Sequence, residues 1–349
     1  EFTKERSALS RFLKSVPVLI AAFLLTQNAG AFQAGWRQIS SAGPGPEAPA
    51  TTVALYYPTQ TLAGAIPMGP FTPHVASGAA PESSVKGLIV LSHGTGGSEL
   101  GHSRLAEGLA EQGYLVAALR HPRDNWQDQS LLNDSPGTYF NERPRQVSWV
   151  IDALLRDPQW KDRIARDALG PRVGAVGHSA GGYTVLALAG GEPDLSRIAK
   201  HCDTERADDP IFCGTGRIGQ PTAQPSATPS ASAPLADRRV RAVVALAPVG
   251  AVFTAQSLAD IRLPVAIYGA EKDRWLVPRF HAEWIAQNLP GVQLHRVPNA
   301  WHFAFMDTPG MAIPSKDGDI GADPPGFDRS AFLKQLARDL PAFFDKAFK

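Results

Sequence analysis

The chain has 349 residues, of which 44% are hydrophobic and 19% are charged. This is enough apolar sequence for one large domain built around a single core. Its 34 basic and 33 acidic residues nearly cancel, and beyond the N-terminus no cluster of lysine and arginine occurs, which argues against a surface that binds nucleic acid or an anionic membrane.

The first 31 residues have the pattern of a secretory signal peptide. Basic residues precede an apolar run at 16–25, and Ala29, Gly30 and Ala31 offer a small-residue cleavage site. The apolar run is shorter than the roughly 20 residues of a membrane-spanning helix, so we expect no stable membrane span. We expect cleavage after Ala31 and a mature domain, residues 32–349, in the periplasm or outside the cell; a retained amphipathic anchor is the alternative.

From about residue 86 onward, strand and helix patterns alternate, which is typical of a mostly parallel sheet covered by helices on both faces. An earlier apolar run at 54–57 predicts one more strand at the beginning of the sheet. We find no internal repeat. Strands are predicted at 86–92, 114–119, 171–177, 239–247, 263–269 and 292–298, and helices at 102–112, 143–157, 180–190, 278–289 and 328–347.

The predicted strand at 86–92 continues into a glycine-rich turn from His93 to Gly97. Backbone N–H groups in such a turn can bind an oxyanion that forms during a reaction. We expect His93 to hold this turn by hydrogen bonding rather than to react. His121 and Asp124 follow the next strand, and they are expected near the same edge of the sheet as substrate contacts or as loop anchors.

Two insertions, at 121–142 and at 191–238, interrupt the alternation of strands and helices. Both begin at the edge of the sheet that holds these polar residues, so we expect them to cap the site; surface loops without substrate contact are the alternative. The second insertion includes a tract rich in proline, serine and alanine at 219–234, which cannot bury a core. It also holds the only two cysteines, Cys202 and Cys213, which in an exported protein predict a disulfide, with two unpaired thiols as the alternative.

Residues Gly177 to Gly181 hold the pattern G-x-S-x-G, with Ser179 at its centre. An apolar strand precedes the motif and a small-residue helix follows it, which is the strand–turn–helix context that this motif requires. The two glycines allow strand and helix to approach closely, and the serine lies at a helix N-terminus, where backbone N–H groups favour negative charge. We therefore expect a strained turn that presents Ser179 as a nucleophile for acyl transfer; a glycine-rich turn with an incidental serine is the alternative.

A serine nucleophile needs a base and an acid that orients the base, and candidates for both follow in the chain order Ser, Asp, His. Asp273 lies just after the predicted strand at 263–269, and His302 follows the last predicted strand. Glu271 and, less well, Asp260 are the alternatives for the acid. For His302 the alternative is a core histidine packed among aromatic side chains.

At these residues the chain resembles the α/β-hydrolase superfamily and, more narrowly, the bacterial branch of dienelactone-hydrolase-like and platelet-activating-factor-acetylhydrolase-like esterases. The resemblance extends from about Gly35 to the C-terminus, and it implies that the backbone N–H groups of Thr95 and Ala180 form an oxyanion hole. Dienelactone hydrolases proper carry a cysteine nucleophile, so the serine at position 179 favours an ordinary carboxylic ester as substrate. The motifs that carry the resemblance lie at 54–59, 91–97, 117–122, 177–182 and 301–305.

The resemblance implies an exported serine hydrolase that cleaves a small-molecule or lipid ester through an acyl-enzyme on Ser179. The alternatives are an amidase, lactonase or acyltransferase on the same three residues, and a non-catalytic hydrolase-like binding protein. We expect no cofactor, and no metal, since the nine histidines show no H-E-x-x-H motif or paired-ligand spacing. The candidates for the substrate pocket are His178, Trp301, Phe303 and His121.

Overall fold

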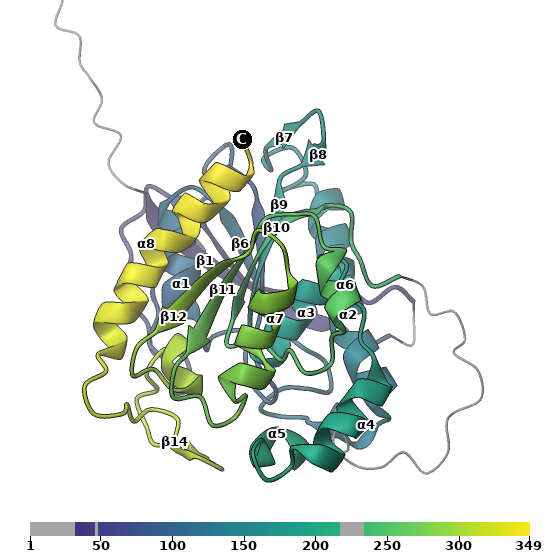
Figure 1. The fold of residues 1–349 in the computed structure, drawn as a ribbon. Helices are drawn as coiled ribbons and strands as arrows, with labels where there is room; N and C mark the ends of the chain where they lie inside the picture. The colour runs from purple at the N-terminus through teal and green to yellow at the C-terminus, as the bar shows by residue number, and fades with distance from the viewer. Residues whose placement is uncertain (1–31, 46–47, 217–233) are drawn as a thin grey trace, which may run out of the picture. The chain divides into compact units, whose positions relative to one another are not determined.

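A computed structural model describes residues 32–45, 48–216 and 234–349 (Figure 1). The predicted signal peptide at 1–31 lies outside the described residues, as does nearly all of the tract at 219–234. Contacts divide the chain between Gly30 and Ala31, and everything described belongs to the second of the two units. Within this described part, no helix is both long and apolar enough to cross a membrane.

Ten strands of the described part form one sheet, in the order β12-β11-β10-β9-β5-β6-β2-β1-β4-β3. Six neighbouring strands run parallel, and they are the six predicted from residue 86 onward, with ends that differ by at most two residues. The predicted mostly parallel sheet is therefore confirmed. These strands are β5 (Leu88–Ser92), β6 (Leu115–Arg120), β9 (Val173–His178), β10 (Val240–Leu246), β11 (Val265–Ala270) and β12 (Gln293–Val297).

Earlier residues extend the sheet beyond β6, beginning with two antiparallel pairings. The apolar run predicted at 54–57 is the middle of β2 (Thr51–Thr59), which pairs with β6 and with β1 (Gln33–Ser41). Strand β1 was not predicted, because five of its nine residues are polar; its backbone pairs with β2 along all nine residues. The remaining short strands are β3 (Gly64–Ala65) and β4 (His74–Ser77) at the sheet edge, and the hairpins β7 (Arg166–Asp167) with β8 (Gly170–Pro171) and β13 (Pro314–Ser315) with β14 (Gly318–Asp319).

Helices cover both faces of the sheet, as predicted (Figure 1). Side chains of successive strand residues point to opposite faces. Thus Leu55 and Tyr57 of β2 join the core beneath α2, α3 and α7, whereas Ala54 and Tyr56 join the core beneath α1 and α8. The helices are α1 (Ser103–Glu111), α2 (Pro136–Arg156), α3 (Ala180–Leu188), α4 (Leu195–Thr204), α5 (Pro210–Cys213), α6 (Ala255–Ala259), α7 (Ala282–Asn288) and α8 (Arg329–Ala347).

Two predicted helices differ from the structure at their ends. Helix α2 begins seven residues before the predicted start at 143, because Ser135 caps it by accepting the Thr138 N–H and Pro136 occupies the first turn. The first insertion thus contains the start of this helix. The helix predicted at 278–289 is interrupted at His281, whose backbone leaves the helical region and whose ring binds neighbouring segments.

The second insertion folds into α4 and α5 over its described residues. Asp194 caps α4 by accepting two backbone N–H groups of its first turn. The predicted disulfide between Cys202 and Cys213 is present, and both cysteines are buried. The bond joins α4 to α5 and stabilises this segment, which has no separate core of its own.

One buried acid on α1 makes stability depend on pH. Burial raises the pKa of Glu107 from 4.5 to about 7, and the charge of Asp307 acts in the same direction. The folded protein therefore holds a proton that the unfolded chain releases, so stability decreases as pH rises from about 4.5 to 7. The shift corresponds to an effect on the order of 3 kcal/mol.

We expect Glu107→Gln to be more stable than the parent above about pH 7, with the difference vanishing near pH 4.5. Glutamine keeps an oxygen that can accept the His74 N–H, which Glu107 binds at 2.9 Å. Urea unfolding at about pH 5 and pH 8 measures the effect. Glu192→Gln, at an exposed position, is the control and should show no such dependence. A stability difference between Glu107→Gln and the parent that does not change with pH would refute the prediction.

Candidate active site

The motif at Gly177–Gly181 forms a tight turn between β9 and α3. Ser179 has φ 58° and ψ −117°, and this positive φ is strained for a residue with a side chain. A Cβ atom at Gly177 would lie 2.0 Å from the Gly181 carbonyl oxygen, and one at Gly181 would lie 1.9 Å from the Ser92 carbonyl oxygen. Only glycine fits at both positions, and this close approach fixes Ser179 at the carboxyl end of β9.

The loops after β11 and β12 bring two further side chains to Ser179. His302 begins a short 3-10 turn (His302–Phe305), and its Nε2 atom lies 2.9 Å from Ser179 Oγ. Its Nδ1 atom lies 2.8 Å from Oδ2 of Asp273, and both side chains are buried. A carboxylate can only accept, so Nδ1–H donates to Asp273, and in this tautomer Nε2 is the acceptor for the Ser179 hydroxyl. The three predicted residues form one continuous hydrogen-bond chain.

The carboxylate of Asp273 is itself held in place. Its other oxygen, Oδ1, accepts the backbone N–H groups of Trp275 at 2.9 Å and Leu276 at 2.8 Å. The alternative acids lie elsewhere: Glu271 is exposed and accepts the Asn299 N–H, and Asp260 is exposed. The structure therefore brings Asp273, and not these two, to His302.

The two predicted oxyanion donors lie on either side of the nucleophile. The N–H of Ala180 is the first of α3 and has no partner within the helix. In the described part of the chain, the N–H of Thr95 donates to no protein group. The preceding carbonyl, that of Gly94, is held by His93 Nδ1 at 2.6 Å and by the Gly97 N–H at 3.1 Å. In a trans peptide the N–H points the opposite way, so the Thr95 N–H faces away from these contacts.

The turn that carries Thr95 lies directly against the nucleophile, since a Cβ atom at Gly94 would lie 3.0 Å from Ser179 Cβ. His93 binds within the turn through Nδ1–H and accepts the His121 N–H at Nε2. Burial and the nearby Arg143 charge keep the pKa of His93 well below 6.5. His93 is therefore a neutral anchor of the turn.

A cavity of about 640 Å³ opens beside Ser179. Its walls are mostly apolar and aromatic, as is usual for sites that bind small organic molecules. Both insertions and the β13–β14 hairpin contribute to it. The first insertion supplies Gln129, Leu132, Tyr139 and Phe140; the second supplies Phe212, Thr215 and Gly216; the hairpin supplies Pro314, Ser315 and Lys316.

The four candidate pocket residues divide into two pairs. His178 and Phe303 line the cavity. His121 and Trp301 do not, contrary to expectation: His121 is fully buried between Ser92 Oγ and Gln146 Oε1, at 2.7 and 2.8 Å, and Trp301 is buried. Burial, with the neighbouring Arg143 charge, keeps the pKa of His121 well below 6.5, so it remains a neutral anchor.

His178 also supports the base, since its Nε2–H donates to the His302 carbonyl at 2.9 Å. Burial, followed by the neighbouring His302, keeps the pKa of His178 well below 6.5. Sequence analysis did not single out Trp275, whose ring stacks on His302 with centroids 5.8 Å apart. Its position two residues after Asp273 on the same turn is the signal that could have found it. Lys316 and its hairpin carry no such signal.

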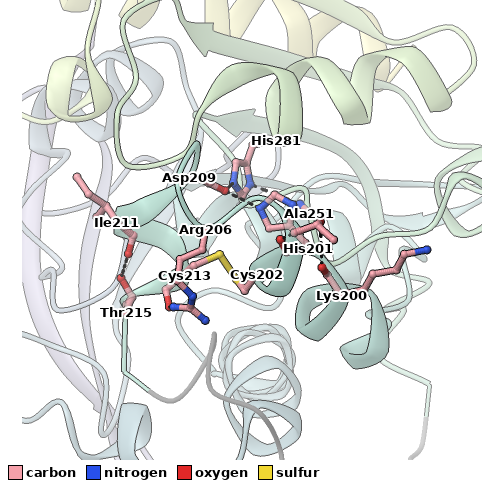
Figure 2. The surroundings of a disulfide bond; sticks show 11 residues. Lys200, His201, Cys202, Arg206, Asp209, Ile211, Cys213, Thr215, Ala251 and His281 are labelled. Carbon is pink, nitrogen blue, oxygen red and sulfur yellow. Dashed lines mark hydrogen bonds and ion pairs between the residues drawn. A yellow bond between two sulfur atoms is a disulfide. The ribbon is translucent and has the colours of Figure 1, made fainter.

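A second group of polar side chains fixes the disulfide segment to the core. Figure 2 shows Asp209 between His201 and His281, whose Nε2 atoms lie 2.8 and 2.9 Å from its Oδ2 atom. These groups lie within 4.8 Å of one another, a spacing that could hold a metal ion. However, His281 Nδ1 accepts the Gly250 N–H at 3.0 Å, so its Nε2 carries the hydrogen and has no lone pair for a metal. The group is therefore a hydrogen-bond network that fixes α5 against α7.

Comparison with known proteins shows partial sequence similarity to cutinases. No family model matches the chain. It is 32% identical over 114 residues to cutinase est1 of Thermobifida alba, which covers 33% of this chain and 34% of that cutinase. It is 28% identical over 114 residues to cutinase cut1 of Thermobifida fusca, covering 33% of this chain and 31% of that one. The chain therefore matches about a third of the length of these relatives.

Among solved structures, the chain is similar to a ferulic acid esterase from Streptomyces cinnamoneus. The TM-score is 0.59 at 24% sequence identity, and the match covers 91% of each chain. At this identity the likeness shows the fold, and it confirms the α/β-hydrolase architecture expected from the motifs.

Proposed function

Since the chain has the α/β-hydrolase fold, we propose that it hydrolyses carboxylic esters through an acyl-enzyme on Ser179. The observation that carries the proposal is the unbroken hydrogen-bond chain from Ser179 through His302 to Asp273, beside a cavity. The relatives agree with this reaction class, because one is by name an esterase and the others are by name cutinases. A small-molecule or lipid ester is the substrate that the mostly apolar cavity suits.

In the proposed reaction, His302 takes the Ser179 proton at Nε2 while Oγ attacks the ester carbonyl carbon. The carbonyl oxygen becomes an oxyanion, which the N–H groups of Ala180 and Thr95 stabilise. Asp273 keeps His302 in the productive tautomer and stabilises its cationic form. The tetrahedral intermediate collapses as His302 donates the proton to the departing alkoxide, leaving an acyl group on Oγ. A water molecule activated by the same base then releases the acid and regenerates Ser179.

A series of p-nitrophenyl esters from acetate to palmitate tests the proposal, with an anilide, a cyclic ester and an acceptor alcohol assayed beside it. Ester turnover that far exceeds anilide cleavage supports an esterase. Predominant anilide cleavage would indicate an amidase. Transfer of the acyl group to the alcohol in preference to water would indicate an acyltransferase. Turnover of a cyclic ester alone would indicate a lactonase. Binding without turnover of any of these compounds would favour a hydrolase-like binding protein.

We further propose that the protein is exported to the periplasm or beyond the cell. The N-terminal pattern and the Cys202–Cys213 disulfide both suit an oxidising compartment. We expect the exported protein to begin at Phe32 and to carry no free thiol. Intact mass after alkylation under denaturing conditions checks both points, and reduction before alkylation should add two labels. A mass that retains residues 1–31, or alkylation without reduction, would contradict the proposal.

A further inference from the structure

A buried carboxylate lies beneath the turn that carries Thr95. Asp124 is fully buried and accepts three hydrogen bonds. Its Oδ1 atom accepts the Gly96 N–H at 2.9 Å, and its Oδ2 atom accepts Tyr139 Oη–H at 3.1 Å and an N–H of Arg143. Asp124 forms an ion pair with the fully buried Arg143, so neither group lies isolated in the core, where an unpaired charge would be costly.

The hydrogens in this network can be placed by elimination. Tyr139 has a single hydroxyl hydrogen, and the carboxylate of Asp124 can only accept. The 2.6 Å contact between Thr95 Oγ1 and Tyr139 Oη is therefore a bond in which Thr95 donates. Thr95 thus donates to Tyr139, and Tyr139 donates to Asp124. Asp124 therefore holds Thr95 through Tyr139, and it holds the next residue, Gly96, directly.

Arg143 extends the network to the other side of the nucleophile. One of its N–H groups donates to the His93 carbonyl, at the start of the turn. Its Nε–H donates to Thr184 Oγ1 at 3.3 Å, and this hydroxyl donates to the Ala180 carbonyl at 2.9 Å. A single buried ion pair thus connects the turn that supplies the Thr95 N–H with the first turn of α3, which supplies the Ala180 N–H.

We propose that the buried Asp124–Arg143 pair sets the positions of the two backbone donors, with Tyr139 as the positioning residue that fixes Thr95. The inference rests on the proposed function, because only an oxyanion makes this placement matter. Loss of one oxyanion donor lowers kcat by about 100- to 1,000-fold. A donor that is retained but misplaced should cost less, about 10- to 100-fold. The effect should appear in kcat rather than KM, because the bond strengthens in the transition state.

Tyr139→Phe removes one hydroxyl and leaves the ring in the cavity wall. We expect kcat on a p-nitrophenyl ester to fall about 10- to 100-fold with little change in KM. A trifluoromethyl ketone binds as a charged tetrahedral adduct, which forms when Ser179 Oγ adds to the ketone carbonyl. Its affinity should fall by a similar factor. The rate constant for labelling of Ser179 by a fluorophosphonate should also decrease, and this readout requires no ester turnover.

Tyr183→Phe is the matched control. Tyr183 is equally buried, and its hydroxyl donates to the Phe140 carbonyl at 2.9 Å without reaching the Thr95 turn. It should lose similar stability but keep kcat within about twofold. Thr95→Val, which removes the hydroxyl but keeps the N–H, should match Tyr139→Phe, and the double variant should be no worse than either single one.

The outcomes separate the inference from the proposed function. If the parent hydrolyses esters and Tyr139→Phe keeps its kcat and ketone affinity, the positioning role is wrong and the esterase stands. Equal losses in Tyr139→Phe and Tyr183→Phe, or additive losses in the double variant, also overturn it, because a general loosening of the core would produce them. A parent enzyme that neither turns over esters nor reacts with the fluorophosphonate removes the proposed function, and the inference falls with it.

Discussion

Alanine at position 179 is expected to lower kcat for ester hydrolysis by about 10⁴- to 10⁶-fold, the range for loss of the nucleophile in a serine hydrolase. The substitution removes only Oγ, which bonds to His302 at 2.9 Å, and it retains the Cβ atom. The close approach of Gly177 and Gly181 that forms the turn is untouched. Thermal unfolding should therefore stay close to that of the parent, so the loss can be assigned to chemistry rather than to misfolding.

The measurement needs a direct test of the reacting atom beside the kinetics. A fluorophosphonate probe should label the parent at Ser179, as peptide mapping would show, and leave the alanine variant unlabelled. Hydrolysis and labelling that both survive in the variant would place the nucleophile elsewhere. An inactive parent that is nonetheless labelled would indicate an activated serine whose substrate is not among the esters assayed.

Much of the sheet could be predicted because buried parallel strands leave a strong local signal. Runs such as Val265–Ala270 are apolar throughout, since helices cover both faces of the sheet. Strand β1 lacked this signal because its outer residues are polar and half exposed, and its place depends on backbone pairing with β2. The break at His281 likewise depends on contacts with Asp209 and Gly250, which are distant in sequence.

The candidate site was predictable where a residue lies in a sequence motif or directly after a predicted strand. Ser179 lies in a motif, and Asp273 and His302 each follow a strand, so the parallel topology brings the three together. The residues that support these three carry no such signal in the local sequence. Arg143 appeared only as the first residue of a predicted helix, although it is fully buried within α2. Nothing local indicates that its partner is Asp124, and only the fold makes this pair part of the site.

Replacing Asp273 with asparagine should lower kcat by about 10⁴-fold, as for the equivalent acid of serine proteases. Oδ1 of Asp273 accepts two backbone N–H groups, from Trp275 and Leu276, so the amide oxygen of asparagine would take this position. The amide nitrogen, a donor, would then face His302 Nδ1, which must accept. His302 would carry its hydrogen on Nε2, facing Ser179, and could no longer take the serine proton.

The matched control is Glu271→Gln, on the same turn. Glu271 is exposed and, among the described residues, its side chain accepts the Asn299 N–H at 2.9 Å, a bond that glutamine can also make. Its kcat should remain within about twofold of the parent, since the loss of an exposed charge outside the hydrogen-bond chain changes little. Steady-state kinetics of both variants on one ester, with thermal unfolding as a check on folding, decide the matter. Asp273 is the carboxylate that contacts His302 Nδ1, so its replacement should cause the larger loss of turnover. A larger loss in Glu271→Gln than in Asp273→Asn would therefore transfer the orienting role to Glu271.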